Sequence, residues 1–339
     1  MISIQQNIAL KPFNTFGIEA YAKKFVTVET LEEIQWLIHQ KIIKDNRLIL
    51  GGGSNILLTK DFDGIVIHNS IKGISIVTED EDHAHVKVGA GEIWHEFVLW
   101  SISNNLGGIE NLSLIPGNVG ASPMQNIGAY GVEIKDVFIE LEAINIDSGE
   151  TVIFTNNDCQ FGYRESVFKN IYKDQYIITS VTYKLDKKHK FNTSYGAIEQ
   201  ELEKQGVKNL SIKAISDAVI AIRSSKLPDP KKIGNSGSFF KNPVVPNNVF
   251  TSIKKEHPSI ASYPSGADHT KIAAGWLIEH AGWKGKTFNN SFGVHKNQAL
   301  VLVNYGNAKG TEIYNLSEQI ITSVKDKFNV DLQREVNIL

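Results

Sequence analysis

The spacing of apolar residues predicts a strand, a helix and a second strand near the start of the chain. Residues 25–28, Phe-Val-Thr-Val, are typical of a strand. Thr30 and Glu33 form a capping-box pattern, and the helix expected after it has apolar residues at positions 34, 37, 38 and 42. A second apolar strand at 48–50 runs directly into the glycine-rich residues 51–55. The pattern therefore predicts a β–α–β unit of about forty residues that is followed by a glycine loop.

The rest of the chain mixes short strands with a few helices, which is typical of an α+β fold. Strands are expected at 65–68, 74–78, 85–88, 137–146, 151–154, 177–185, 299–303 and 330–338. Helices are expected at 92–104, 212–225, 268–281 and 309–328. The proline-rich residues 226–230 indicate a domain boundary after the second of these helices.

Residues 111–132 form an uncharged span that is rich in glycine. Glycine lets a backbone approach a partner closely, and consecutive N–H groups in such a loop can bind an anion. Together with residues 51–55, this span suggests a ligand that carries a pyrophosphate and a large ring. Ordinary tight turns are the alternative explanation.

The composition is that of an ordinary globular protein, because 42% of the 339 residues are hydrophobic and 21% are charged. The formal net charge of −2 provides no positive field for nucleic acid. The single cysteine, Cys159, cannot form an internal disulfide or a metal-ligand set, and we expect a small buried side chain. No export signal or membrane-spanning stretch is recognisable. We therefore expect a soluble cytoplasmic protein without metal, nucleic acid, membrane contact or an obligate protein partner.

Two common nucleotide-binding signatures are each incomplete because one required glycine is missing. Residues 285–287, Gly-Lys-Thr, resemble the end of a P-loop, but position 280 is His where that motif needs glycine. The pair Gly89 and Gly91 lacks the third glycine of the dinucleotide fingerprint, because position 94 is Trp. The ligand is therefore not expected to be bound by a P-loop or a Rossmann fingerprint.

Five motifs follow one another along the chain. They are 50–55 (Leu-Gly-Gly-Gly-Ser-Asn), 115–121 (Ile-Pro-Gly-Asn-Val-Gly-Ala), 125–131 (Gln-Asn-Ile-Gly-Ala-Tyr-Gly), 161–164 (Phe-Gly-Tyr-Arg) and 237–243 (Gly-Ser-Phe-Phe-Lys-Asn-Pro). Together they resemble the UDP-N-acetylenolpyruvoylglucosamine reductase family, flavoenzymes that make UDP-N-acetylmuramate for bacterial peptidoglycan. The resemblance extends from the Asn-Thr-Phe-Gly sequence at 14–17 to Glu335, and Tyr195 is similar to the tyrosine loop of the longer subtype.

The resemblance implies an FAD-binding fold of the vanillyl-alcohol-oxidase type in two subdomains, followed by an α+β substrate domain. The implied boundaries are 1–70 and 71–225 for the subdomains, 226–330 for the substrate domain and 331–339 for a C-terminal strand that contributes to the active site. FAD is expected to be bound non-covalently, since neither His nor Cys occurs in 51–55 or 111–132. FAD contacts are implied for Gly51, Gly52, Gly53, Ser54, Asn55, Pro116, Gly117, Gly120, Ala121, Gln125, Asn126, Gly128, Ala129, Tyr130 and Gly131.

In the implied reaction NADPH reduces FAD, and flavin N5 then delivers hydride to the enolpyruvyl group of UDP-N-acetylglucosamine enolpyruvate. Negative charge develops beside the substrate carboxylate, so the protein must stabilise that charge and supply a proton. The resemblance implies that Arg164 and a protonated Glu335 stabilise this charge. It implies that Ser238 supplies the proton. Outside the family context, Arg164 would form a salt bridge, Glu335 would be solvated, and Ser238 would cap a turn. Ser236 is a rival proton donor.

Tyr163, Tyr195, Lys226, Asn242 and Gln298 match positions that bind the anionic substrate in the family. Lys226 follows a predicted helix at the domain boundary, so a solvated lysine is the alternative there. The alternative enzyme is another FAD oxidoreductase of the same fold, one that oxidises an alcohol or a lactone with oxygen. A non-catalytic flavin-binding module is a second alternative. The ordered polar motifs favour the reductase, with a role in peptidoglycan synthesis, cell shape and cell division.

Overall fold

The structure is a computed structural model that describes residues 2–44 and 46–339, and these residues form two compact units. The first unit holds the N-terminal residues up to Ile8, then Ala22–Gly52 and Asp63–Ser225. The second holds Ala9–Tyr21, Gly53–Phe62 and Lys226–Leu339. Each unit is thus built from segments that are far apart in the sequence. The domain boundaries proposed above stay predictions.

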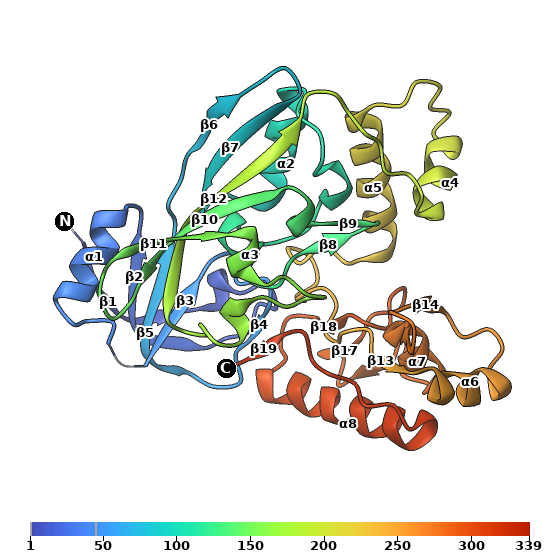
Figure 1. The fold of residues 1–339 in the computed structure, drawn as a ribbon. Helices are drawn as coiled ribbons and strands as arrows, with labels where there is room; N and C mark the ends of the chain where they lie inside the picture. Colours follow the sequence, from blue (N-terminus) through green and yellow to red (C-terminus); the bar gives the residue numbers. More distant parts are fainter. Residues whose placement is uncertain (1, 45) are drawn as a thin grey trace. The chain divides into compact units, whose positions relative to one another are not determined.

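The first sheet has the strand order β1-β2-β5-β3, and helix α1 connects β2 to β3 (Figure 1). The bounds are β1 Gln5–Ala9, β2 Tyr21–Val28, α1 Leu31–His39, β3 Arg47–Leu50 and β5 Phe62–Asn69. Both predicted strands and the helix between them are confirmed. However, β5 lies between β2 and β3 and runs parallel to β3. The hydrogen-bonding partner of β3 is therefore β5, which comes later in the chain, and β3 does not pair with β2.

Helix α1 begins where the capping pattern predicts, with one difference. The Thr30 side chain accepts the Glu33 N–H at 3.3 Å. The Glu33 carboxylate accepts the N–H of Glu29 at 2.7 Å, one residue before the position that a capping box uses. Ile34 and Leu37 are fully buried, so the predicted apolar face does form the core side of the helix.

The second sheet has five antiparallel strands in the order β11-β10-β12-β7-β6 (Figure 1). The bounds are β6 Ile74–Glu79, β7 His83–Gly89, β10 Phe138–Asn145, β11 Thr151–Thr155 and β12 Tyr176–Asp186. Every strand predicted between residues 65 and 185 is confirmed. The helix predicted at 92–104 is α2, Trp94–Ser103.

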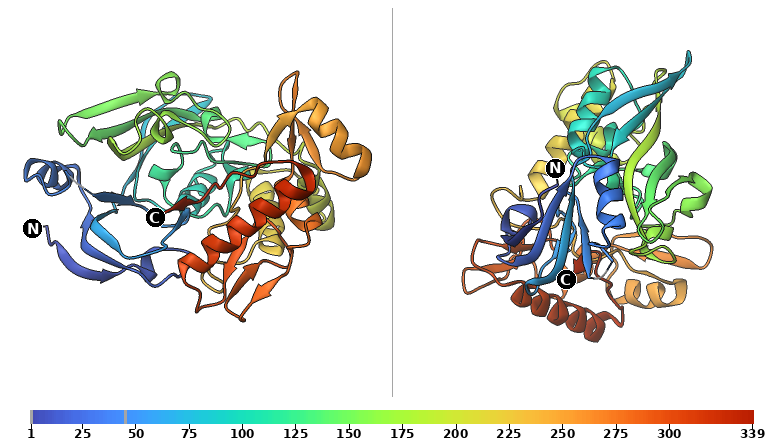
Figure 2. Two further views of the ribbon diagram at one scale, coloured as in Figure 1. Left: turned by 90° about the horizontal axis from the view of Figure 1, so that it is seen from below. Right: turned by 90° about the vertical axis from the view of Figure 1, so that its left-hand side faces the viewer.

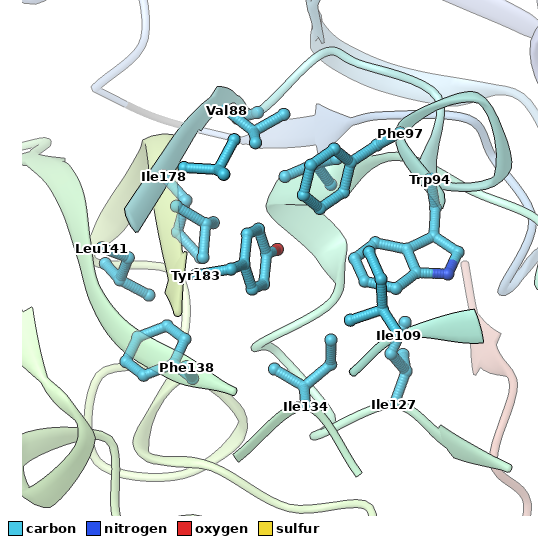
Figure 3. Packing of buried hydrophobic residues seen from close by; sticks show 14 of the residues in the cluster. Val88, Trp94, Phe97, Ile109, Ile127, Ile134, Phe138, Leu141, Ile178 and Tyr183 are labelled. Atoms are coloured by element: carbon cyan, nitrogen blue, oxygen red, sulfur yellow. The ribbon is translucent and has the colours of Figure 1, made fainter. Parts of the chain in front are cut away.

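A cluster of aromatic and aliphatic side chains packs beneath this sheet and includes α2 (Figure 3). Trp94 and Tyr183 are fully buried at its centre, with ring centroids 5.9 Å apart. The polar atoms of both rings form hydrogen bonds to residues of the span 111–132. Trp94 Nε1 donates to Leu112 O at 2.9 Å, and the Tyr183 hydroxyl lies 2.7 Å from Ser122 Oγ. The core therefore fixes two points of the uncharged span 111–132.

The first unit also contains helices outside its sheets. They are α3 (Asn156–Cys159), α4 (Gly196–Lys204) and α5 (Ile212–Lys226), and a small hairpin joins β8 (Gly128–Ala129) to β9 (Val132–Glu133). Helix α5 matches the helix predicted at 212–225, whereas α4 was not predicted. Cys159 is fully buried, as predicted, and burial raises the pKa of its thiol to about 12. The thiol is therefore protonated at neutral pH.

The second unit combines small sheets with three helices. The strand orders are β13-β15-β14, β16-β17-β18 and β19-β4. The bounds are β4 Ile56–Leu57, β13 Val244–Pro246, α6 Asn247–Glu256, β14 Ser262–Pro264, β15 His269–Ile272, α7 Ala274–His280, β16 Thr287–Phe288, β17 Phe292–Val294, β18 Leu302–Asn304, α8 Gly310–Phe328 and β19 Asn337–Ile338. Helix α8 packs against α7, β17 and β18 (Figure 2) and confirms the helix predicted at 309–328.

Several predictions in the second unit need correction. The helix predicted at 268–281 begins only at Ala274, because residues 269–272 form β15 between β13 and β14. The strand predicted at 330–338 is reduced to β19 and an isolated bridge between Phe240 and Arg334, since only these residues find a strand partner. The strand predicted at 299–303 begins at Leu302. Within residues 2–44 and 46–339, no helix has both the length and the apolar character needed to span a membrane.

Candidate functional site

The first two glycine motifs meet inside the first unit. A Cβ added to Gly52 would lie 2.8 Å from Asn118 Oδ1 and 3.1 Å from Gly117 Cα. The Asn118 side chain is held at this contact because its Nδ2 donates to Gly91 O at 3.0 Å. Any side chain at position 52 would push the two loops apart. The fold thus requires glycine where these motifs touch.

The backbone of the first loop presents hydrogen-bond donors. Among the described residues, the N–H groups of the consecutive residues Gly52, Gly53 and Ser54 have no acceptor. Adjacent N–H groups of this kind form a donor set suited to phosphate oxygens. The loop is therefore chemically suited to an anionic ligand.

The third and fourth motifs are also joined inside the first unit. Asn126 Nδ2 donates to Gly162 O at 3.0 Å. Arg164 donates from Nη1 to Asn126 O at 3.3 Å and from Nη2 to Gly128 O at 2.5 Å. The Arg164 guanidinium also lies 5.4 Å from the centroid of the Tyr163 ring. These contacts orient Arg164 on the loop that carries the third motif.

Tyr130, at the end of the third motif, contacts the tyrosine of the longer subtype. The rings of Tyr130 and Tyr195 pack edge to face with centroids 5.4 Å apart. Asn111 Nδ2 donates to Tyr130 O at 3.0 Å, which fixes the backbone at this point. Burial raises the pKa of Tyr130, and the nearby Arg223 guanidinium in α5 opposes that shift. Tyr130 also packs against an apolar cluster that includes Val219 and Ile222 of α5.

The remaining residues of the implied cofactor set lie along the same span. Pro116 and Ala121 are exposed, Gln125 is half-buried, Ala129 is in β8, and Gly131 has a φ of 81°. Gly120 N–H donates to Ala90 O at 2.9 Å, and a Cβ at position 120 would lie 2.6 Å from Ala90 Cβ. This close approach explains why the second motif has glycine at position 120.

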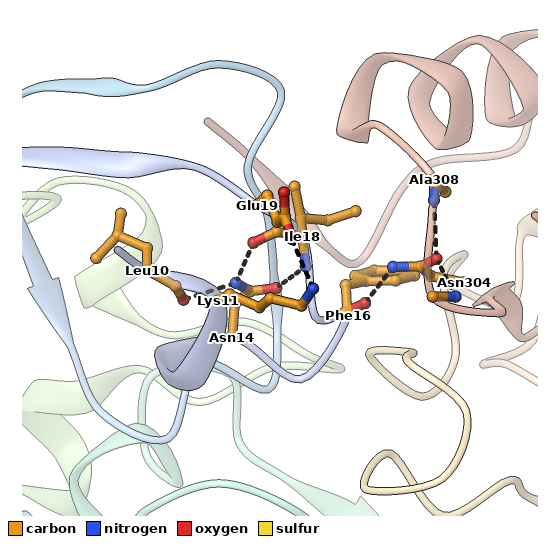
Figure 4. Close-up of polar contacts among 9 residues, drawn as sticks. Leu10, Lys11, Asn14, Phe16, Ile18, Glu19, Asn304 and Ala308 are labelled. Carbon is orange, nitrogen blue, oxygen red and sulfur yellow. Dashed lines mark hydrogen bonds and ion pairs between the residues drawn. The ribbon is translucent and has the colours of Figure 1, made fainter. Parts of the chain in front are cut away.

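In the second unit, Asn14 closes the turn that carries the Asn-Thr-Phe-Gly sequence (Figure 4). Its Nδ2 donates to Leu10 O at 2.8 Å and to Ile18 O at 3.0 Å, and its Oδ1 accepts the Ile18 N–H at 2.9 Å. Gly53 packs directly on this turn. It has a φ of 58°, and a Cβ there would lie 2.0 Å from Phe13 O. Glycine is therefore required at position 53 for both its backbone conformation and its packing.

The fifth motif lies beside the C-terminal segment, also within the second unit. Glu335 N–H donates to Phe239 O at 2.8 Å, which places Glu335 opposite the segment that contains Ser238. Asn55 joins this group, since its Nδ2 donates to Glu335 O at 3.2 Å. Two of the three residues with a predicted catalytic role, Ser238 and Glu335, thus lie on neighbouring segments of the second unit.

The two serines near this motif have different surroundings. Ser236 is buried, and its hydroxyl donates to Ile56 O at 3.3 Å. Ser238 is half-buried, and its hydroxyl has no hydrogen-bond partner in the part of the chain that the structure describes. Only the Ser238 hydroxyl can therefore donate to a ligand without losing a contact within the protein.

Two residues with a predicted substrate role converge at the start of α7. Asn242 Oδ1 accepts the Ala274 N–H at 2.9 Å. Gln298 Oε1 lies 3.1 Å from the position of a Cβ built on Gly275. Lys226 is not part of this cluster, because it is the exposed last residue of α5, where the chain passes into the second unit.

Comparison with known protein families gives a match in the N-terminal half of the chain and another in its C-terminal third. Residues 22–155 match a family model described as FAD binding domain, and residues 229–339 match one described as UDP-N-acetylenolpyruvoylglucosamine reductase, C-terminal domain. A UDP-N-acetylenolpyruvoylglucosamine reductase of Flavobacterium johnsoniae is 56% identical over 339 residues, which is 100% of both chains. The chain belongs to the UDP-N-acetylenolpyruvoylglucosamine reductase family.

Other members of this reductase family agree with the assignment. The reductase of Amoebophilus asiaticus is 48% identical over 100% of both chains. The crystal structure of the reductase from Thermus caldophilus has a TM-score of 0.70 at 22% identity and covers 100% of this chain and 99% of that one. The predicted α+β fold, with an FAD-binding domain ahead of a C-terminal domain, is confirmed.

Sequence analysis missed two side chains at these loops. Asn118 lies inside the second motif, but an asparagine in a glycine-rich turn usually bonds only to its own backbone. Arg223 is a single arginine in a helix, a pattern that usually indicates a solvated side chain. Only the packing of α5 shows that its Nε atom is buried.

Proposed function

We propose that this protein catalyses the NADPH-dependent reduction of UDP-N-acetylglucosamine enolpyruvate to UDP-N-acetylmuramate with non-covalently bound FAD. The observation that carries the proposal is 56% identity, over the whole of both chains, to a protein named for this reductase. A place in peptidoglycan synthesis, and through it in cell shape and division, belongs to the same proposal. So does a cytoplasmic location, where the nucleotide substrates are made.

The residues of the glycine loops fit FAD. The N–H groups of Gly52, Gly53 and Ser54 offer donors for a pyrophosphate, and the contact between Gly52 and Asn118 leaves no side chain in the way. When bound, FAD would carry hydride from NADPH to the enolpyruvyl group. The protein itself has to hold the carboxylate, stabilise the negative charge and supply a proton.

Arg164 is proposed to hold the substrate carboxylate. A guanidinium has five N–H groups, so it can bind a carboxylate as well as the carbonyl oxygens of Asn126 and Gly128. Glu335 is proposed to act at the same developing charge in its protonated form. The hydrogen bond from Glu335 N–H to Phe239 O supports a shared position for Glu335 and Ser238.

Ser238 is proposed to donate the proton. Its hydroxyl has no partner among the described residues, whereas the Ser236 hydroxyl is engaged with Ile56 O. A serine is a weak acid, but the acceptor is a carbanion-like carbon, so donation in a preorganised site is chemically reasonable.

A visible spectrum of the purified protein, titrated anaerobically with NADPH and then with the enolpyruvyl substrate, tests the proposal. A yellow protein that is bleached by NADPH and recovers on substrate addition is the expected result. Recovery only after oxygen is admitted would favour the oxidase alternative. A colourless protein that cannot be reconstituted with FAD would reject both.

Stopped-flow traces of Ser238→Ala test the proton donor. Reduction by NADPH should stay close to the wild-type rate, while reoxidation by substrate should slow by a factor of roughly 100 or more, the usual scale of a lost proton donor. Ser236→Ala is the matched variant and should leave both rates nearly unchanged. Equal losses in the two half-reactions of Ser238→Ala would reject the role.

Tyr163, Tyr195, Lys226, Asn242 and Gln298 are proposed to bind the substrate. The diphosphate and carboxylate of this ligand attract cations, so Lys226→Ala should raise the apparent KM with little change in kcat. Lys231→Ala, an exposed lysine in the same segment, is the control. An unchanged KM for Lys226→Ala would remove this residue from the site and leave the solvated-lysine alternative.

A further inference from the structure

A half-buried cation that has no carboxylate partner among the described residues lies beside the loops of the first unit. Arg223 is in helix α5, and its Nε atom is buried with no hydrogen-bond partner. Burial lowers the pKa of Arg223, yet a guanidinium keeps its charge at the pH values that proteins experience. Lys213 on the same helix is the contrasting case, because it is exposed and pairs with Asp217 at 2.6 Å.

No carboxylate in the described part of the chain compensates this charge. Among the described residues, the proximity of Tyr130 favours the charged form of Arg223, against the larger effect of burial on its pKa. His95 faces the same region, and its pKa is lowered mainly by burial and further by the Arg223 charge, while Glu96 opposes the shift. Taking a charged group out of water without a partner is unfavourable, and a bound anion at this position would relieve that cost.

The position of Arg223 indicates which ligand this is. Helix α5 contacts the uncharged span at both ends, since Ser216 Oγ lies 2.8 Å from Ser113 Oγ and Tyr130 packs against the apolar cluster that includes Ile222 of α5. These contacts place the cation next to the span for which FAD contact is proposed.

We propose that Arg223 is the counter-cation for an anionic group of bound FAD, and that Tyr130 orients its guanidinium. Two parts of FAD have this chemistry, namely the pyrophosphate, which is always charged, and the ring, which gains negative charge on reduction. The inference rests on the proposed function, because it requires that the chain binds FAD. Arg223 makes no covalent bond in this role and transfers no proton.

The test compares Arg223→Met, which removes the charge at similar length, with Arg223→Lys, which retains it. The holoenzyme is used to measure the Kd of oxidised FAD by fluorescence and the midpoint potential of the bound flavin. If the partner is the pyrophosphate, Arg223→Met should raise the Kd at least tenfold. If the partner is the reduced ring, the Kd of oxidised FAD should change less than twofold. Reduced FAD should then bind about tenfold more weakly, which lowers the midpoint potential of the flavin by about 30 mV.

Controls separate a charge effect from a packing effect. Arg223→Lys should restore most of the lost affinity or potential, and Tyr130→Phe should cause a smaller change of the same sign. Lys213→Met removes a solvated cation from the same helix and should match wild type. If Arg223→Met does not fold, Tyr130→Phe still decides, because a cation with no role toward FAD would leave both the Kd and the potential at wild type in that variant.

Two results would overturn the inference. One is an Arg223→Met holoenzyme with unchanged Kd and potential. The other is a change confined to the KM for NADPH or for the enolpyruvyl substrate, which would assign the cation to that ligand. Failure of the proposed function gives a different result, because the wild-type chain itself would then bind no FAD.

Discussion

Replacing Asn304 with alanine should destabilise the second unit by about 3 kcal/mol. Asn304 is 3% exposed, and its side chain joins three segments (Figure 4). Nδ2 donates to Phe16 O at 2.8 Å. Oδ1 accepts the N–H groups of Gly306 at 2.8 Å and Ala308 at 3.1 Å. The amide therefore ties the end of β18 and the approach to α8 to the turn that supports Gly53.

The magnitude depends on which of the partners can reach water after the change. Gly306 is exposed, so its N–H can bond to water at little cost. Phe16 and Ala308 are buried, and a buried polar group that loses its partner costs about 1–3 kcal/mol. Water that enters the space left by the amide reduces this cost, which gives a net loss of about 3 kcal/mol.

Hydrogen exchange measured by mass spectrometry is the appropriate assay because it reports the two units separately. A loss of about 3 kcal/mol corresponds to roughly 100-fold faster exchange in peptides that cover residues 304–310 and 14–18. Peptides from residues 84–98 belong to the first unit and serve as the internal reference. Asn248→Ala is the matched control, since Asn248 is exposed in α6 and its side chain makes no hydrogen bond to the described residues.

Exchange that is less than about threefold faster at 304–310 would refute the reasoning, because water would then replace the three hydrogen bonds without cost. Asn304→Asp provides a second test. It keeps the acceptor but places a carboxylate oxygen opposite Phe16 O. The pKa of the new carboxyl should therefore rise in the folded state, so stability should recover as pH falls through that pKa. Recovery as pH rises would contradict the assigned geometry.

Three further changes test other contacts. Gly53→Ala should lower Tm and weaken FAD binding, because a φ of 58° alone costs an L-residue about 1–2 kcal/mol and the added Cβ would meet Phe13 O. Gly17→Ala is the control, since Gly17 has a φ of 65° with no atom close to the added Cβ, and it should show only the backbone cost. Tyr183→Phe should cost about 1–3 kcal/mol in urea unfolding by leaving Ser122 Oγ unpaired, and adding Ser122→Ala should recover part of the loss. Burial raises the pKa of the Glu110 carboxyl above its usual 4.5. Wild type should therefore lose stability relative to Glu110→Gln as pH rises from 4.5 through the folded-state pKa. A difference in Tm between the two proteins that changes in the opposite direction with pH would reject the raised pKa.

Local pattern was sufficient where an element depends on its own residues. The periodicity of apolar positions predicted α8 within one residue of its start, because a helix satisfies its backbone hydrogen bonds internally. Five ordered motifs predicted the family, since each requires specific side chains at short spacing. Residues 269–272 were predicted as the start of the helix that follows them, yet they form a strand, because β13 and β14 provide partners on both sides.

The candidate site divides in the same way. The sequence by itself determined which loops are rich in glycine and which polar side chains occur in the motifs, because both are properties of neighbouring residues. Only the tertiary structure decided that Gly52 lies against Asn118, that Glu335 is opposite the Ser238 segment, and that no carboxylate among the described residues pairs with Arg223. The physical reason is that a hydrogen bond, a close approach or a missing counter-ion depends on what distant segments bring into contact, and residue spacing carries no information about that.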